Sequence, residues 1–140
     1  MTRYNNSLVL ILVLALALNE SRVVIGRQHV YVGNDLGEGL TLNLHCKSKD
    51  DDLGTHVLSY GQNQTWGFRT NLFGTTLFWC NFQWGNVSDS HEVYNAQETE
   101  MRKRTNTHWL SRQDGLYYYY HDAEEYELQY KWGTTKTKGN

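Results

Sequence analysis

The segment LFWCNFQW, residues 77–84, alternates two sets of side chains along its length. Successive side chains of an extended strand point to opposite faces, so every second residue shares a face. One face collects the apolar residues expected in a core: Phe78, Cys80, Phe82 and Trp84. Leu77 and Trp79 lie on the other face, which favours a central strand that is covered on both sides.

The same alternation with a period of two recurs from Val30 to Trp132, and no stretch keeps a helical apolar period for three turns. A second stripe runs through Leu40, Leu42, Leu44 and Cys46. The expected strands cover residues 30–32, 40–46, 57–58, 64–69, 77–84, 92–95, 109–112, 116–120 and 126–132. About eight short strands at this spacing predict an all-β protein, a small β-sandwich with an open barrel as the alternative.

Length and composition narrow the class of protein further. The chain has 140 residues and a mass of 16.4 kDa, which allows one compact domain and excludes a multidomain enzyme. Thirteen basic residues against 15 acidic ones give a net charge of −2, without the basic excess that binding a nucleic acid requires. Five Trp, 10 Tyr and 4 Phe give more apolar surface to bury than a disordered chain carries.

The N-terminal region has the features of a secretory signal peptide. Residues 8–18 read LVLILVLALAL behind Arg3, and this run is too short for a transmembrane helix, which needs about 20 apolar residues. We predict a signal peptide in residues 1–26, cleaved between 17 and 26, with an uncleaved membrane anchor as the alternative. A soluble, extracellular domain over residues 27–132 would follow, with residues 133–140, GTTKTKGN, as a disordered polar tail.

Secretion determines how the two cysteines are interpreted. Cys46 and Cys80 would enter an oxidising compartment, where an even number of cysteines usually forms disulfides, so we expect them to pair. Free buried thiols are the alternative. A bridge across 34 residues would contribute about 3.5 to 4 kcal/mol, according to the loop-entropy relation. A redox role would require a Cys-x-x-Cys spacing, which the sequence lacks.

The sequence contains no motif that indicates catalysis or a bound cofactor. His-Glu-x-x-His and Gly-x-Ser-x-Gly are both missing, and the six histidines are scattered. The adjacent residues Asp50, Asp51 and Asp52 lack the alternate spacing of a calcium loop. Glu98 and Glu100 lie in a charged segment with nothing to raise a carboxyl pKa. We therefore expect no enzymatic activity, no metal and no cofactor.

The sequence also contains two candidate glycosylation sites and a run of tyrosines. Asn63 and Asn86 begin Asn-x-Ser/Thr triplets in predicted turns, which makes them candidates for N-glycosylation. Residues 117–120 are four consecutive tyrosines, of which alternate members face opposite sides of a strand. An exposed pair could stack on a sugar or anchor a protein partner.

Taken in order, several motifs identify a known family. They are Val30-x-Val32-x-Asn34-x-Leu36, Leu42-x-Leu44-His45-Cys46-Lys47-Ser48-Lys49-Asp50-x-Asp52-Leu53-Gly54, Trp66-x-Phe68-x-x-Asn71-x-Phe73, Phe78-x-Cys80-x-Phe82-x-Trp84, and Trp109 with Asp114-Gly115-Leu116-Tyr117. In these residues the chain resembles the plant self-incompatibility S1 family, whose members are also called S-protein homologues. The motifs extend from Val30 to about Tyr120, and the stretch from His45 to Gly54 is the most distinctive.

The resemblance implies a secreted, disulfide-bonded β-sandwich without enzymatic activity. In the poppy-type system, a plasma-membrane receptor on pollen recognises such a protein, and calcium enters the pollen tube. The family usually has four cysteines, and the second pair precedes the equivalent of Trp109. Here that region reads Lys103 to Thr107 without cysteine, which leaves Cys46 and Cys80 to bond each other and predicts a looser loop over residues 96–106.

The preferred function is that of a secreted recognition ligand, a monomer that binds a plasma-membrane receptor protein through its inter-strand loops. The candidate loops run from Asp50 to Thr55, Gly85 to His91 and Gln97 to Asn106. Their candidate contact residues are Asp50, Asp51, Asp52, Asp89, His91, Glu98, Glu100, Arg102, Lys103 and Arg104. The alternative is an extracellular carbohydrate-binding module that uses Tyr118, Tyr120 or Trp79 as a stacking platform. An immunoglobulin-like adhesion domain and a secreted hydrolase are less favoured.

Overall fold

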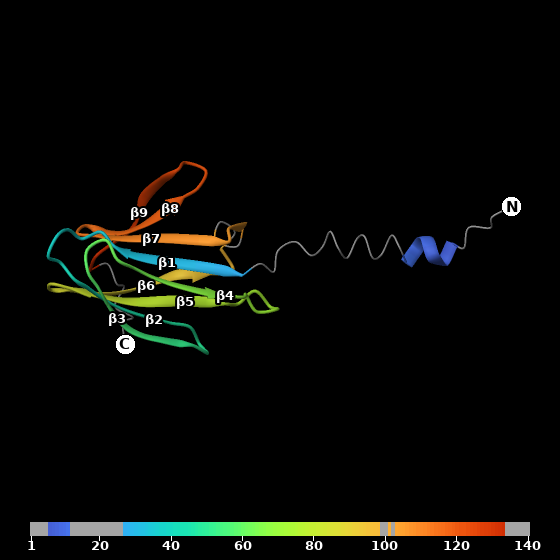
Figure 1. Ribbon diagram of the computed structural model, residues 1–140, viewed down its shortest axis with the longest axis horizontal. Coiled ribbons are helices and arrows are strands. Elements are labelled where there is room, and N and C mark those ends of the chain that lie inside the picture. Colours follow the sequence, from blue (N-terminus) through green and yellow to red (C-terminus); the bar gives the residue numbers. More distant parts are fainter. Residues whose placement is uncertain (1–5, 12–26, 99–100, 102, 134–140) are drawn as a thin grey trace.

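The computed structural model describes residues 6–11, 27–98, 101 and 103–133 (Figure 1). Residues 6–11 form a short helical segment, and the remaining described residues form a β-sheet protein. In this described part, no helix has the length and apolar character needed to cross a membrane. The predicted cleavage region and residues 134–140 of the predicted tail lie outside the described residues.

Within the described residues, nine strands form two sheets that face each other, which confirms the predicted all-β sandwich (Figure 1). The five-stranded sheet has the order β4-β1-β7-β8-β9, and the four-stranded sheet has the order β3-β2-β5-β6. The strands are β1 (Gln28–Asn34), β2 (Leu42–Lys47), β3 (Asp52–Leu58), β4 (Asn63–Phe68), β5 (Leu77–Trp84), β6 (Val87–Asn95), β7 (Asn106–Arg112), β8 (Gly115–Tyr120) and β9 (Glu125–Lys131).

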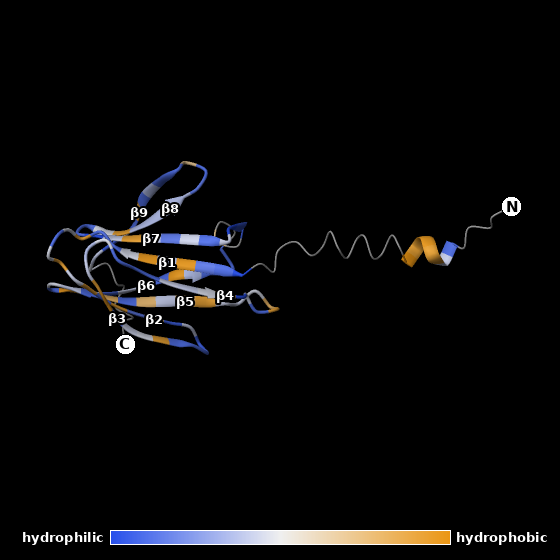
Figure 2. Cartoon of the chain, viewed as in Figure 1, coloured by the Kyte–Doolittle hydropathy of each residue, from blue (hydrophilic) through white to orange (hydrophobic). Residues whose placement is uncertain are grey.

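The core lies between the sheets and is built by the alternating residues of the interior strands. On β5, Phe78, Cys80 and Phe82 are buried as predicted, and β5 lies between β2 and β6. Figure 2 shows hydrophobic residues concentrated on strands such as β1 and β5. The expectation that β5 is covered on both sides is wrong for its second half, because Asn81 and Gln83 on its outer face are exposed to solvent, whereas Leu77 and Trp79 are half-buried.

Two strands, β3 and β6, begin well before the residue that the sequence pattern predicted. β3 begins at Asp52, whereas the predicted strand begins at residue 57. The sequence pattern missed the first part of this edge strand because it is almost entirely exposed and lacks apolar alternation. β6 begins at Val87, whereas the predicted strand begins at residue 92. The sequence pattern missed its first part because polar side chains occupy two of its inward positions. These inward residues are Asp89 and His91.

The disulfide between Cys46 and Cys80 is present, as predicted. The two residues lie directly opposite each other on the antiparallel strands β2 and β5, and both are fully buried. The bridge therefore joins two neighbouring strands of one sheet and does not cross between the sheets.

A tight hairpin turn joins β7 and β8. Its turn consists of Gln113 and Asp114, and Gly115 is already the first residue of β8. A Cβ at this position would collide with the backbone carbonyl of Tyr130 on β9. Glycine is required here by the close approach of the neighbouring strand.

Candidate recognition surface

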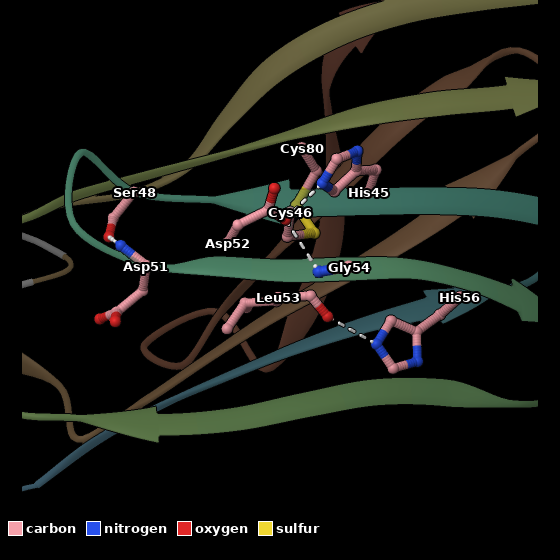
Figure 3. A network of polar contacts seen from close by, with 9 residues as sticks. All are labelled: His45, Cys46, Ser48, Asp51, Asp52, Leu53, Gly54, His56 and Cys80. Atoms are coloured by element: carbon pink, nitrogen blue, oxygen red, sulfur yellow. Dashed lines mark hydrogen bonds and ion pairs between the residues drawn. A yellow bond between two sulfur atoms is a disulfide. The ribbon is translucent and has the colours of Figure 1, made fainter.

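The turn between β2 and β3 is organised by residues of the stretch from His45 to Gly54 (Figure 3). His45 Nε2 lies 2.5 Å from Asp52 Oδ1, and the same oxygen accepts a 2.9 Å hydrogen bond from the Gly54 backbone N–H. Gly54 has a φ of +74°, a conformation that favours glycine. The hydrogen bonds from Gly54 and His45 lower the pKa of Asp52. These residues therefore fix the shape of the turn.

A second pair of hydrogen bonds closes the tip of this turn. The Ser48 backbone N–H donates to the Asp51 carbonyl at 2.8 Å, and the Asp51 N–H donates to Ser48 Oγ at 3.1 Å (Figure 3). Lys49 and Asp50 between them are exposed. The tip therefore presents one positive and one negative side chain on a fixed backbone.

The loop between β4 and β5, residues 69–76, is held by one asparagine. Asn71 Oδ1 accepts a 2.8 Å hydrogen bond from the Thr75 N–H, and the Asn71 carbonyl accepts one of 3.1 Å from Gly74. This arrangement leaves Leu72 and Phe73 outside the fold, with 92% and 87% of their surface exposed. Large apolar residues with such exposure are typical of contact sites for partners.

The β2–β3 turn and the β4–β5 loop border an open hollow of about 470 Å³. Phe78 and Trp79 of β5 line it, together with charged side chains from both loops. The charged lining residues are Lys49, Asp50, Asp51 and Arg69. Aromatic residues together with charges of both signs resemble the composition of a protein-binding surface.

The loop between β6 and β7 begins beside the β4–β5 loop, at Ala96 and Gln97. The Ala96 N–H donates to the Thr76 carbonyl at 2.9 Å, and Gln97 Nε2 donates to the Gly74 carbonyl at 2.9 Å. Figure 1 shows the β2–β3 turn, the β4–β5 loop and the β6–β7 loop at the same end of the sandwich. We call the described residues of these three segments, 48–51, 69–76, 96–98, 101 and 103–105, the loop end.

The structure places the predicted contact residues of the β6–β7 loop in different settings. Glu98 and Lys103 are exposed, whereas Arg104 pairs with Asp122 of the β8–β9 turn at 2.5 Å. Glu100 and Arg102 lie outside the described residues. The described part of the predicted looser loop is thus attached both to the β4–β5 loop and to the β8–β9 turn.

Three predicted contact residues are not on loops. Asp52 is the first residue of β3, although it is exposed. Asp89 and His91 lie inside β6 and are buried, at 5% and 9% exposure, so placing them on a recognition loop was wrong. The turn between β5 and β6 also lies at the opposite end of the sandwich from the loop end (Figure 1). Sequence patterns suggested a loop there because charged residues are rarely directed inward.

Asp89 and His91 attach the C-terminal strand to the four-stranded sheet. Asp89 Oδ2 lies 3.0 Å from His91 Nε2 and accepts a 3.0 Å hydrogen bond from the Gly133 N–H. The His91 ring stacks on Tyr130 of β9 with centroids 4.3 Å apart. The folded chain therefore includes Gly133, one residue beyond the predicted domain boundary.

The candidate glycosylation residues are exposed, whereas the residues of the predicted sugar platform are buried or half-buried. Asn86 is exposed in the β5–β6 turn as predicted, whereas Asn63 is exposed as the first residue of β4 rather than in a turn. Tyr118 is only 3% exposed, so its predicted role as a sugar platform is wrong. Trp79 and Tyr120 are half-buried.

Comparison with known proteins identifies the family. The sequence profile of the family described as plant self-incompatibility protein S1 matches residues 29–132, which is most of the chain and includes the whole sandwich up to Trp132. The chain belongs to the plant self-incompatibility S1 family. S1-family relatives in Arabidopsis thaliana include S-protein homolog 2, which is 34% identical over 76% of this chain and 68% of its own length. S-protein homolog 3 is 47% identical over 52% of this chain, and the match spans about half of its own length, 49%.

A solved S1-family structure has the same fold. It is described as an SPH (self-incompatibility protein homologue) protein of a widespread family of small, highly stable, secreted proteins from plants. Its TM-score is 0.60 at 21% sequence identity, with 76% of this chain and 94% of that chain covered.

Sequence reasoning missed Leu72 and Phe73 as candidate contact residues. Two adjacent apolar residues between Asn71 and Gly74 cannot both face a core from a short turn, and this placement is the signal that could have found them. Among the described residues, no three His, Cys, Asp or Glu side chains are grouped closely enough to hold a metal ion.

Proposed function

We propose that this S1-family protein is a secreted recognition ligand that acts as a monomer and binds a plasma-membrane receptor protein through the loop end. The observation that carries the proposal is the exposure of Leu72 and Phe73, 92% and 87%, on a loop that Asn71 holds in shape. A pre-ordered apolar anchor loses little conformational entropy on binding, so most of its burial contributes to affinity.

The surroundings of this anchor support a protein partner. The hollow beside it has Phe78 and Trp79 in its lining and charges of both signs at its border. Interfaces commonly place aromatic residues at the centre and charged groups at the rim, where they determine orientation and association rate. No residue of the loop end takes a catalytic role in this proposal.

The binding test uses the labelled mature protein on plasma membranes from pollen, root and leaf. We expect saturable binding to membranes of at least one tissue. Replacing both apolar residues, Leu72→Ser with Phe73→Ser, should weaken this binding by about tenfold or more, because central apolar anchors dominate interface energies. The matched control is Val57→Ser on the edge strand β3, which removes an apolar side chain that is 64% exposed outside the loop end.

Two results would contradict the proposal. One is the lack of saturable binding in every tissue by a protein that melts cooperatively. The other is equal binding by the wild type and the Leu72→Ser, Phe73→Ser variant. Sedimentation of the labelled protein should give the mass of one chain.

We also propose that Asn63 and Asn86 carry N-linked glycans. Both side chains are exposed, and Asn86 lies in a two-residue turn that a transferase can reach. Expression through a plant secretory pathway should give a protein whose mass falls on enzymatic deglycosylation. The Asn63→Gln and Asn86→Gln variants should each remove one part of that difference. An unchanged intact mass after deglycosylation of the wild type would refute the assignment.

A further inference from the structure

A small cavity is lined by residues of β6 from the four-stranded sheet and of β7, β8 and β9 from the five-stranded sheet. It has a volume of about 230 Å³, and the β6–β7 loop contributes to its wall. Four aromatic rings from β7, β8 and β9 and two carboxylates line it: Trp109, Tyr118, Tyr120, Tyr130, Glu92 and Glu98. None of these residues belongs to the exposed anchor at the loop end.

Three of these four rings pack against one another at steep angles, and we call the four rings together the aromatic cage. The Trp109 and Tyr118 centroids are 4.9 Å apart with their planes at 64°, and Tyr118 and Tyr120 are 4.9 Å apart at 77°. Tyr130 lies nearly parallel to Trp109, at 21° and 6.1 Å. Trp109 and Tyr118 are almost fully buried, so the half-buried rings of Tyr120 and Tyr130 supply most of the aromatic surface that a ligand could reach.

The cage is held in place from outside. Trp109 Nε1 donates a 2.8 Å hydrogen bond to the Val93 carbonyl of β6, which fixes the indole ring. Tyr130 is stacked on His91, which in turn contacts the buried carboxylate of Asp89 at 3.0 Å. A pre-ordered cage needs little rearrangement to accept a ligand.

The charged residues that line the cavity are all acidic. Glu92 and Glu98 line it, and none of its described lining residues is Lys, Arg or His. Burial and then these two carboxylates raise the pKa of the Tyr130 phenol, as expected for a site with negative potential. A neutral apolar ligand would gain nothing from these carboxylates, and an inorganic cation would need several converging oxygen ligands instead of ring faces.

We propose that this cavity binds the alkylammonium group of a small organic amine. The ring faces attract the cation through their quadrupoles, and the two carboxylates at the wall supply the opposite charge. The cavity volume of about 230 Å³ suits an ammonium group with its attached methyl or methylene groups. Glu98 belongs both to this site and to the loop end, whereas Leu72 and Phe73 of the proposed receptor contact do not line the cavity.

The first test compares a cation with its neutral isostere on the mature protein. Choline and 3,3-dimethylbutan-1-ol have the same shape and differ in charge, so their binding is measured by titration of tryptophan fluorescence and by NMR line shifts. Choline should bind about tenfold more tightly than the alcohol, because a desolvated cation–π contact supplies an attraction that the neutral group lacks. Spermidine and Nα-acetyl-lysine methylamide, titrated in parallel, distinguish a free polyamine from a lysine side chain as the source of the ammonium group.

Charge-removing variants then locate the site. The double variant Glu92→Gln with Glu98→Gln keeps the shape of the wall and should weaken choline binding by about threefold or more, as expected for partly exposed charges. Tyr120→Leu removes one ring and should also weaken it. The matched control Asp50→Asn removes an exposed carboxylate from the turn between β2 and β3, which β5 separates from β6 in the four-stranded sheet, and should leave choline binding unchanged.

Two outcomes would overturn the proposal. Either none of the three cations binds more tightly than the neutral alcohol, or the Glu92→Gln, Glu98→Gln variant and Tyr120→Leu both bind choline as the wild type does. Cooperative thermal melts of every variant ensure that lost binding does not reflect lost folding.

Discussion

Replacing both cysteines, Cys46→Ala with Cys80→Ala, should lower the free energy of unfolding by about 3.5 to 4 kcal/mol. The bridge closes a loop with a sequence separation of 34 residues, and its removal restores the entropy of that loop in the unfolded chain. Both residues are fully buried between core neighbours, so the variant also loses packed sulfur atoms. For a domain of this size the melting temperature should fall by roughly 15 °C.

The measurement is thermal and urea unfolding of the mature protein, followed by near-ultraviolet circular dichroism of its aromatic residues. The control is wild type with a reducing agent, which should approach the stability of the double variant. If the double variant melts within a few degrees of the oxidised wild type, the bridge does not contribute the stability assigned to it. Alanine is used because serine would place a hydroxyl group in an apolar site.

Replacing the buried carboxylate, Asp89→Asn, should cost about 2 kcal/mol, since the side chain loses its charge-assisted hydrogen bonds. In the native protein burial acts to raise the pKa of Asp89, but hydrogen bonds from Ser90 and Gly133 and the contact with His91 outweigh it and lower the pKa. The variant should therefore loosen the attachment of β9 and Gly133 to β6. The matched control is Asp50→Asn, whose carboxylate is exposed and which should change stability little.

The same carboxylate predicts a pH dependence. A carboxyl group with a lowered folded-state pKa stabilises the protein above its unfolded pKa, and this contribution is lost as pH falls through the folded value. The stability difference between the wild type and Asp89→Asn should therefore be constant from about pH 5 to neutral and shrink below the ordinary Asp value of 3.8. Urea unfolding at a series of pH values measures it. A difference that grows with acid would contradict the assignment.

Prediction from sequence succeeded where one strand face is continuously apolar. The stripe from Phe78 to Phe82 identified an interior strand and located Cys80 in the core, because alternation directly reports which side is buried. Prediction from sequence failed for the first part of β6. There the inward residues Asp89 and His91 are charged or polar, so the alternation of apolar and polar residues disappears. Their partners, Gly133 and Tyr130, lie about 40 residues further along the chain, and only the folded structure brings them together.

The loop end was also predicted only in part, because the sequence pattern shows which segments are loops but not which loops lie together. The charged segments after Lys47 and Ala96 were recognised as loops because they lack apolar periodicity. That they meet the β4–β5 loop at one end depends on strand order, which pairs β2 with β5 and β5 with β6. The aromatic cage was not foreseen, because Trp109 and Tyr118 belong to an ordinary core stripe and Glu92 and Glu98 come from the other side of the cavity.

The position of β1 has a consequence for the order in which the protein is built. This first strand lies between β4 and β7, and its parallel partner β7 begins only at Asn106. During synthesis, β1 cannot pair with β7 until nearly the whole domain has been synthesised. By then β2, β3, β5 and β6 can already pair with one another. Such distant pairing slows folding and leaves an open strand edge that can join another chain. The four-stranded sheet, with its disulfide, is thus the part able to form first and to offer a template for the rest.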